Sequence, residues 1–146
     1  MPVLELDDGT RLCQSIAIYD YVATVHGFQP ESPLDKHRGA SLYEAFAVDC
    51  FYKFIPQAVF LAKPEERDAK MEVAAAEYLK GAAHVERILS QREDKFICGN
   101  KLTIHDFTVG GIFLNLLINP NAKDVEFWAK LWESTPDRVK KYVADL

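Results

Sequence analysis

The feature that most constrains the fold is the uneven placement of strand and helix patterns. Strand-like sequence is confined to the start of the chain, where residues 3–6 (VLEL) and 10–13 (TRLC) flank the turn sequence Asp7-Asp8-Gly9. Two short apolar runs joined by an Asp-Gly turn are typical of a β-hairpin. Beyond residue 37, apolar residues recur at helical spacing instead. The sequence therefore predicts an α+β protein that is mostly α.

A first helix is predicted directly after the hairpin. Ser15 stands at its start as an expected N-cap, and Gly27 is expected to end it. Residues 27–36, which contain two prolines, form the one convincing internal boundary. We therefore predict a small N-terminal unit at 1–26, a linker at 27–36 and an all-helical domain at 37–146.

Two long helical segments and a polar loop fill the middle of the chain. Residues 38–62 are rich in aromatic side chains, and Pro56 is expected to kink or divide this segment. A proline followed by two glutamates favours a helix that begins at Pro64 and runs to about Leu89. Residues 90–101 are polar and are predicted to be a loop.

The clearest local signal in the second half is a capping box. Thr103 is expected to cap a helix, and Asp106, three residues later, to reach back to the backbone N–H of Thr103. Leu102 and Phe107 occupy the two positions of a hydrophobic staple around this cap. We therefore predict that Thr103 and Asp106 serve folding rather than catalysis.

Composition excludes several classes of function. The net charge is −5 at 146 residues, which disfavours nucleic acid, because phosphate binding depends on clustered Lys and Arg. The longest apolar run, 109–118, is too short for a membrane span and contains Asn115. No basic region followed by an apolar one opens the chain, so we expect no signal peptide and a cytoplasmic protein.

Cysteine and histidine do not point to a metal. Cys13, Cys50 and Cys98 are odd in number and widely spaced, which favours free thiols, and none of the four histidines has metal-ligand spacing. Cys13 is expected to be a small buried strand residue. His105 is expected to be an exposed residue in the first turn of its helix.

Three motifs together resemble the glutathione transferase family, over the whole length of the chain. The first is Pro2-Val3-Leu4-Glu5, then Asp8-Gly9, then Gln14-Ser15-Ile16-Ala17-Ile18. The second is the capping signature at 99–107, and the third is the closing segment from Trp132 through 136–142. The similarity is greatest to the cytosolic sigma-like or related classes. It implies a thioredoxin-like ββα piece followed by the family's all-α C-terminal domain.

The resemblance also implies a glutathione site. In the family, the proline that matches Pro2 is cis, and the backbone of the next residue, Val3 here, pairs with the cysteinyl part of glutathione. Gln14 and Ser15 would hold the γ-glutamyl end, because a hydroxyl and a helix N-terminus suit a carboxylate. Taken alone, Ser15 is better explained by simple helix capping. No metal or other cofactor is implied.

Two departures from the family bear on activity. The family's first strand, helix and strand, which include the thiol-activating tyrosine of the sigma-like group, match nothing in this sequence, so no catalytic residue is assigned. Lys53 stands where many members place an acid that reaches across the dimer to the glutathione amine. Without the activating group, binding can survive while turnover should fall steeply.

The sequence thus supports two functions. One is glutathione conjugation to an electrophile, or glutathione-dependent isomerisation. Tyr43, Phe46 and Phe51 are candidate walls of the substrate pocket, although packing in the core is the favoured explanation of these three rings. The other is a non-catalytic, glutathione transferase-like interaction subunit of a larger assembly. A shortened half-domain is expected to leave a strand edge uncovered, so we also predict a homodimer or a protein partner that completes it.

Overall fold

The computed structural model describes residues 2–146, and it contains the predicted hairpin. Strand β1 (Val3–Glu5) pairs antiparallel with β2 (Arg11–Cys13), and Val3 lies opposite Cys13. The turn between them is closed by Thr10, whose backbone N–H donates to Asp8 Oδ1 at 2.8 Å. Gly9 has φ 83°, a left-handed conformation that glycine adopts without steric cost. The Asp-Gly turn signal therefore produced the expected local structure.

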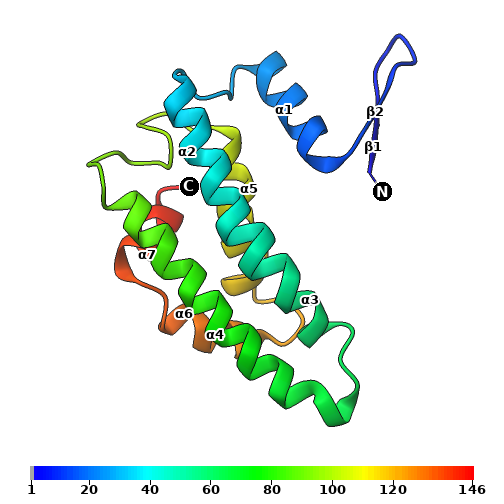
Figure 1. Cartoon of the computed structure of the whole chain (residues 1–146), viewed down its shortest axis with the longest axis vertical. Helices are drawn as coiled ribbons and strands as arrows, with labels where there is room; N and C mark the ends of the chain where they lie inside the picture. The colour runs from blue at the N-terminus through cyan, green and yellow to red at the C-terminus, as the bar shows by residue number, and fades with distance from the viewer. Residues whose placement is uncertain (1) are drawn as a thin grey trace.

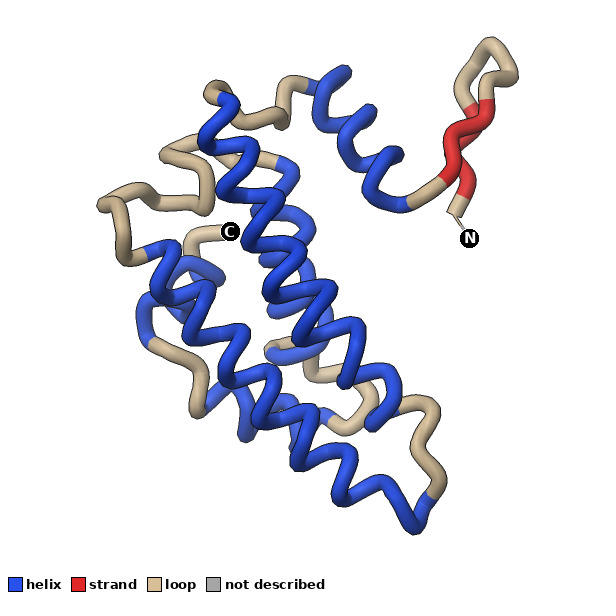
Figure 2. Tube along the Cα trace, viewed as in Figure 1, coloured by secondary structure: helices blue, strands red, loops and turns tan. Residues whose placement is uncertain are grey.

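Helices make up most of the remaining chain (Figure 1). They are α1 (Ser15–His26), α2 (Pro33–Tyr43), the π-helical segment η1 (Glu44–Tyr52), α3 (Lys53–Val59), α4 (Pro64–Leu89), α5 (Ile104–Ile112), the π-helical segment η2 (Phe113–Leu117), α6 (Val125–Glu133) and α7 (Asp137–Ala144). The α2–η1–α3 rod runs antiparallel to α4, and α5 packs against the rod (Figure 1). Helices α6 and α7 pack on α4, while the hairpin and α1 lie to one side (Figure 2). The mostly helical α+β class is confirmed.

Large aromatic side chains form the centre of the helical body. The ring of Phe46 stacks on that of Phe113, with ring centroids 5.1 Å apart, and so joins η1 to η2. The fully buried Tyr78 of α4 meets both rings, and the fully buried Trp128 of α6 stacks on Phe51. The hydroxyl of Tyr78 shares a 2.7 Å hydrogen bond with Thr135, so its burial leaves no unpaired hydroxyl.

The helix irregularity expected at Pro56 lies directly upstream of it. Pro56 sits inside α3. Because proline has no N–H, it cannot donate to the carbonyl four residues earlier, that of Tyr52. The π-helical segment ends at Tyr52, so the chain stays helical and the wide turns of 44–52 take up the irregularity.

Helix α2 begins inside the range predicted to be linker. Ser32 is its N-cap, and the Ser32 hydroxyl accepts a 3.0 Å hydrogen bond from the backbone N–H of Asp35. Pro33 occupies the first helical turn, where its missing N–H costs nothing. This local cap signal explains why the helix starts earlier than the run of prolines suggested.

Three contacts join α1 and Phe28, just beyond its end, to the helical body. The backbone N–H of Ile104 donates to the carbonyl of Phe28 at 2.9 Å, and the Phe28 ring meets Phe107 edge to face at 5.1 Å. On the other side, Lys36 of α2 forms a 3.1 Å ion pair with Asp20 of α1. Helix α1 is therefore held at its C-terminal end and across to α2.

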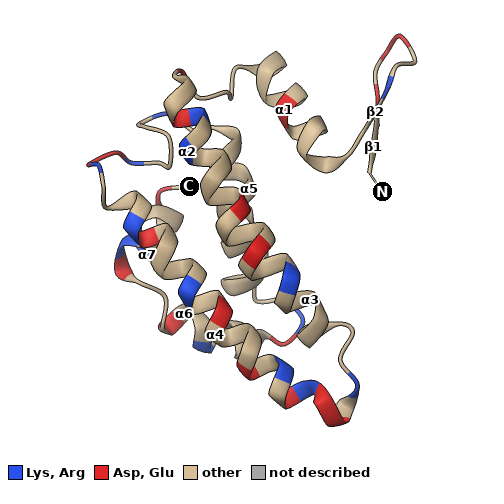
Figure 3. Ribbon diagram, in the orientation of Figure 1, with Lys and Arg blue, Asp and Glu red and all other residues tan. Residues whose placement is uncertain are grey.

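Residues of both charge signs are interspersed along α4 (Figure 3). Such mixing gives a solvated helix face rather than a field of one sign. Among the described residues, no helix is both long and apolar enough to cross a membrane.

Candidate functional site

The start of α1 has unusual backbone geometry. Gln14, not Ser15, occupies the N-cap position, and no side chain makes a capping hydrogen bond there. The prediction that Ser15 caps the helix was therefore wrong by one residue. Gln14 has φ 72° and ψ 119°, and positive φ is uncommon for residues other than glycine. This turn carries the chain from β2 into α1 and places the half-buried Ser15 in the first helical turn rather than at the N-cap.

The hairpin places Val3 beside this turn. Val3 pairs with Cys13, the residue directly before Gln14, and Val3 itself is 56% exposed. Pro2 precedes it and is exposed. The predicted cis geometry concerns the Met1–Pro2 bond, and Met1 lies outside the described residues. The structure thus gathers Pro2, Val3, Gln14 and Ser15 at one end of the hairpin, beside a helix N-terminus.

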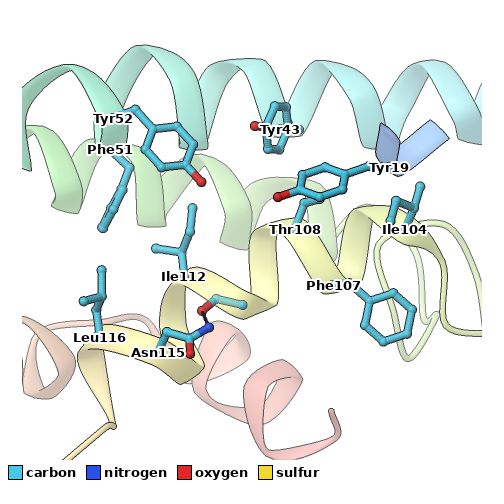
Figure 4. A pocket seen from close by; sticks show the side chains of 11 residues that line it. Tyr19, Tyr43, Phe51, Tyr52, Ile104, Phe107, Thr108, Ile112, Asn115 and Leu116 are labelled. Carbon is cyan, nitrogen blue, oxygen red and sulfur yellow. Dashed lines mark hydrogen bonds between the residues drawn. The ribbon is translucent and has the colours of Figure 1, made fainter. Parts of the chain in front are cut away.

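A groove of about 330 Å³ lies where α1, the α2–η1 rod and the α5–η2 segment meet (Figure 4). Tyrosines from three elements line it: Tyr19 from α1, Tyr43 from α2 and Tyr52 from η1. The opposite wall comes from α5 and η2, and its residues are Ile104, Phe107, Thr108, Gly111, Ile112, Asn115 and Leu116. The groove is therefore mainly apolar, with phenol hydroxyls along one side.

The π-helical segment explains why Tyr43 and Tyr52 share this groove. Residues nine apart in an α-helix lie about half a turn out of phase, so a regular helix would point the two side chains in opposite directions. The wider turns of η1 put more residues in each turn and bring the two onto one face. Sequence periodicity alone therefore excludes Tyr52 from a site that contains Tyr43.

Burial raises the pKa values of two of the groove tyrosines, Tyr43 and Tyr52. Burial, followed by the nearby Tyr52 and Tyr19, raises the pKa of Tyr43 to about 12. Burial also raises the pKa of Tyr52, and Tyr19 beside it acts in the same direction. Tyr43 and Tyr52 consequently present neutral hydroxyl groups to the groove rather than phenolates.

A second hollow of about 490 Å³ adjoins the groove and extends to the start of α1. It shares Tyr19, Tyr43, Ile104 and Thr108 with the groove, and Gln14 lies in its wall. These two hollows therefore have a common wall between the turn at Gln14 and the aromatic groove. A ligand at the start of α1 and one in the groove would be neighbours.

The candidate pocket residues divide between groove and core. Tyr43 and Phe51 line the groove. Phe46 does not line it: its ring is fully buried against Phe113, because it faces α4 and η2 from the other side of the rod. Tyr19 and Tyr52, which the sequence analysis did not single out, contribute more of the exposed lining.

Thr103 and Asp106 form a capping box that is buried in the helical body. Asp106 Oδ2 accepts from the backbone N–H and the hydroxyl of Thr103, both at 2.8 Å. Asp106 Oδ1 accepts from the backbone N–H of Ile97 at 3.0 Å and from the Tyr142 hydroxyl at 3.2 Å. The carboxylate therefore joins α5 to the preceding loop and to α7, away from the groove.

Two side-chain environments differ from expectation. Cys13 is exposed, because its strand β2 packs mainly against β1 and α1. His105 is half-buried rather than exposed, because its ring packs against Gly39 of α2. Burial lowers the pKa of His105. Within residues 2–146, no group of His, Cys, Asp or Glu is arranged to hold a metal ion.

One protein family matches this sequence. The family model described as "Glutathione S-transferase, C-terminal domain" matches residues 48–145, more than half of the chain. No curated protein sequence matches.

Solved structures share the fold at low sequence identity. The glutathione S-transferase Blo t 8 has a TM-score of 0.78 at 19% identity, over 99% of this chain and 62% of that chain. The monomeric Na-GST-3 from the hookworm Necator americanus has a TM-score of 0.77 at 20% identity, over 99% of this chain and 66% of that one. A glutathione transferase homologue from Sulfitobacter, with bound glutathione, has a TM-score of 0.66 at 15% identity, over 99% of this chain and 74% of that chain.

The first two of these proteins are longer, and the chain spans less than two thirds of either. At these identities the structural likeness establishes the fold, whereas the family match over 48–145 rests on sequence. Together with the hairpin and the helical body, these findings show that the chain belongs to the glutathione S-transferase family.

Proposed function

We propose that the chain binds glutathione at the start of α1 and presents its thiol to an electrophile, or to an isomerisable substrate, held in the tyrosine-lined groove. The observation that carries this proposal is the common wall between the hollow at Gln14 and the groove. Bound glutathione in the Sulfitobacter homologue supports the choice of ligand.

The four residues at the hairpin end have the chemistry that this peptide requires. The Ser15 hydroxyl and the N-terminus of α1 suit the γ-glutamyl carboxylate, because both offer donors beside the positive end of a helix dipole. Val3, which is 56% exposed, begins β1, and this strand offers an edge to the cysteinyl part. We propose that Pro2 and Gln14 shape this edge, and that residues 1–26 form the glutathione-binding unit, joined by 27–36 to the helical domain.

Calorimetric titration of glutathione into the 146-residue protein tests this site. Because hydrogen bonds to charged groups are stronger than neutral ones, Ser15→Ala should weaken binding by about tenfold or more. Ser41→Ala, at an exposed position on α2, is the matched control and should leave affinity unchanged. Absence of binding by a sample with helical circular dichroism would contradict the proposal.

A second candidate function is that of an interaction subunit, and the surface of α1 favours it. Ile16 and Val25 are 50% and 58% exposed, so the helix presents apolar side chains to solvent. We propose that a second copy or another protein covers this face. Sedimentation velocity tests whether a second copy covers this face, and a well-folded monomer at all concentrations would contradict that. If the monomer also bound neither glutathione nor another protein, both proposed functions would be refuted.

A further inference from the structure

A hollow of about 410 Å³ lies between the antiparallel helices α3 and α4, on residues that the glutathione proposal does not use. Each helix supplies one wall, and the lining residues are Lys53, Phe54 and Gln57 from α3 and Ala69, Lys70 and Val73 from α4. Residues four apart lie on one face of a helix, so the pairs 53/57 and 69/73 each form a continuous strip. We name this space the α3–α4 hollow.

One part of the α3–α4 hollow is apolar. The Phe54 ring is half-buried and packs against the core of the helical body. Val73 faces it from α4 and is 51% exposed. Ala69, one turn before Val73, has a short side chain that leaves space between the helices. The ring and the valine therefore offer a surface for one large apolar side chain.

The charge of the α3–α4 hollow is opposite in sign to that of the whole chain. Lys53 and Lys70 line it, and none of its described lining residues is acidic, whereas the chain has a net charge of −5. Lys70 forms a 2.7 Å ion pair with Glu66. Within residues 2–146, Lys53 forms no ion pair, and its ammonium lies 5.3 Å from the centroid of the Phe54 ring. This cation–π contact holds Lys53 beside the apolar surface, with its charge available to an anion.

Gln57 adds a polar group that a plain hydrocarbon chain would not use. Its side chain is half-buried in the wall and makes no hydrogen bond to another described residue. A side-chain amide offers N–H donors and a C=O acceptor, the same two groups that a peptide bond carries. A cation, an apolar surface and a free amide in one hollow therefore suit the end of a peptide better than they suit a fatty acid.

We propose that the α3–α4 hollow binds the C-terminal end of a partner polypeptide whose last residue is large and apolar. Lys53 pairs with the terminal carboxylate, the last side chain packs between Phe54 and Val73, and Gln57 bonds to the last peptide group. The chain's own C-terminus is not the occupant within one molecule, because the side chain of Leu146 packs against Gly110.

Titration of a short peptide into the 146-residue protein, followed by ¹⁵N–¹H nuclear magnetic resonance, tests this site. The probe is acetyl-glycyl-alanyl-phenylalanine with a free carboxylate, and its C-terminal amide is the matched peptide without the charge. The free acid should shift the side-chain NH₂ signals of Gln57. Because an exposed ion pair changes affinity by about threefold to fivefold, the acid should bind tighter than the amide by that factor. Lys53→Met should remove this difference and leave the affinity of the amide unchanged.

Variants separate the three contacts from one another. Lys130→Met, at an exposed lysine of α6 outside the hollow, is the control and should change nothing. Gln57→Met should weaken both peptides but not 3-phenylpropanoate, which has the ring and the carboxylate without a peptide group. Higher salt should weaken binding of the acid and not of the amide. Ser15→Ala should leave peptide binding unchanged, so failure of this site and failure of the glutathione site are distinguishable.

Four results would overturn the proposal. These are equal affinities of the acid and the amide, an unchanged affinity of the acid in Lys53→Met, signal shifts confined to α1, and binding of 3-phenylpropanoate as tight as that of the peptide. The last of these would assign the hollow to small aromatic acids. Sedimentation velocity covers the remaining occupant: a dimer that excludes the peptide would assign the hollow to a second copy and would also overturn the proposal.

Discussion

Replacement of Asp106 by alanine tests how the helical body is held together. The Asp106 carboxylate is fully buried and accepts four hydrogen bonds, from Ile97, from Tyr142 and twice from Thr103. Asp106→Ala would leave two backbone N–H groups and two hydroxyls without this acceptor. Each buried donor left unpaired costs about 1–3 kcal/mol, and these costs are not additive because water and small movements relieve part of them.

We therefore expect Asp106→Ala to lower the free energy of unfolding by about 3–5 kcal/mol, a large part of the ~5–15 kcal/mol typical of a domain. Urea denaturation followed by far-ultraviolet circular dichroism measures this change. Tyr142→Phe removes only one of the four bonds, the one at 3.2 Å, and should cost about 1 kcal/mol.

Comparison of the variants decides whether the reasoning holds. Asp106→Asn keeps one acceptor oxygen and should fall between the other two, which provides a measurement if Asp106→Ala does not fold. A loss below about 1 kcal/mol for Asp106→Ala would refute the reasoning, because it would mean that water or neighbouring groups satisfy all four donors. Equal losses for Asp106→Ala and Tyr142→Phe would show that the carboxylate stabilises only the attachment of α7.

Three further predictions concern the helix contacts. Gly39→Ala would place its Cβ 2.1 Å from the ring of His105. This overpacking should lower the free energy of unfolding by about 1–3 kcal/mol, as measured by thermal melts. The added cost of Gly39→Ala should be smaller in the double variant Gly39→Ala, His105→Ala, which lacks the ring. Burial lowers the pKa of His105 below 6.5, so the unfolded state binds a proton more readily than the folded state. Stability should therefore fall as the pH drops through 6.5. The difference between the melting temperatures at pH 8 and pH 5.5 should be larger for the native chain than for His105→Gln. Arg67 forms a 2.7 Å ion pair with Asp124 at the start of α6, and because both side chains are at least 70% buried, Arg67→Met should cost about 1–2 kcal/mol in urea, whereas an unchanged midpoint would show that the pair contributes nothing.

Local signals in the sequence predicted the parts of the fold that local chemistry determines. Asp8-Gly9 placed the hairpin turn, and the Thr103–Asp106 pair placed the start of α5. The same reasoning failed where a distant segment decides the environment. His105 is half-buried because Gly39, on another helix, leaves room for its ring.

The groove could be predicted only in part, for two physical reasons. Tyr43 and Phe51 were recognised as candidates, but Tyr19 joins them only because α1 lies against α5, a long-range contact. Tyr52 was missed because a regular helical period places it opposite Tyr43, and a π-helical segment has no simple sequence signature. The direction in which each side chain of η1 points is therefore what could not be predicted from the sequence pattern.

The π-helical segment also affects how this chain is aligned with its relatives. A helix that uses Glu44–Tyr52 for its wide turns contains more residues over the same length than a relative with a regular α-helix there. Superposition by structure and alignment by sequence then differ by at least one position beyond Tyr52. Lys53 is the first residue after the segment, so this difference directly affects which residue of a relative it is aligned with. Whether Lys53 corresponds to the family's acidic residue therefore has to be decided from superposed structures.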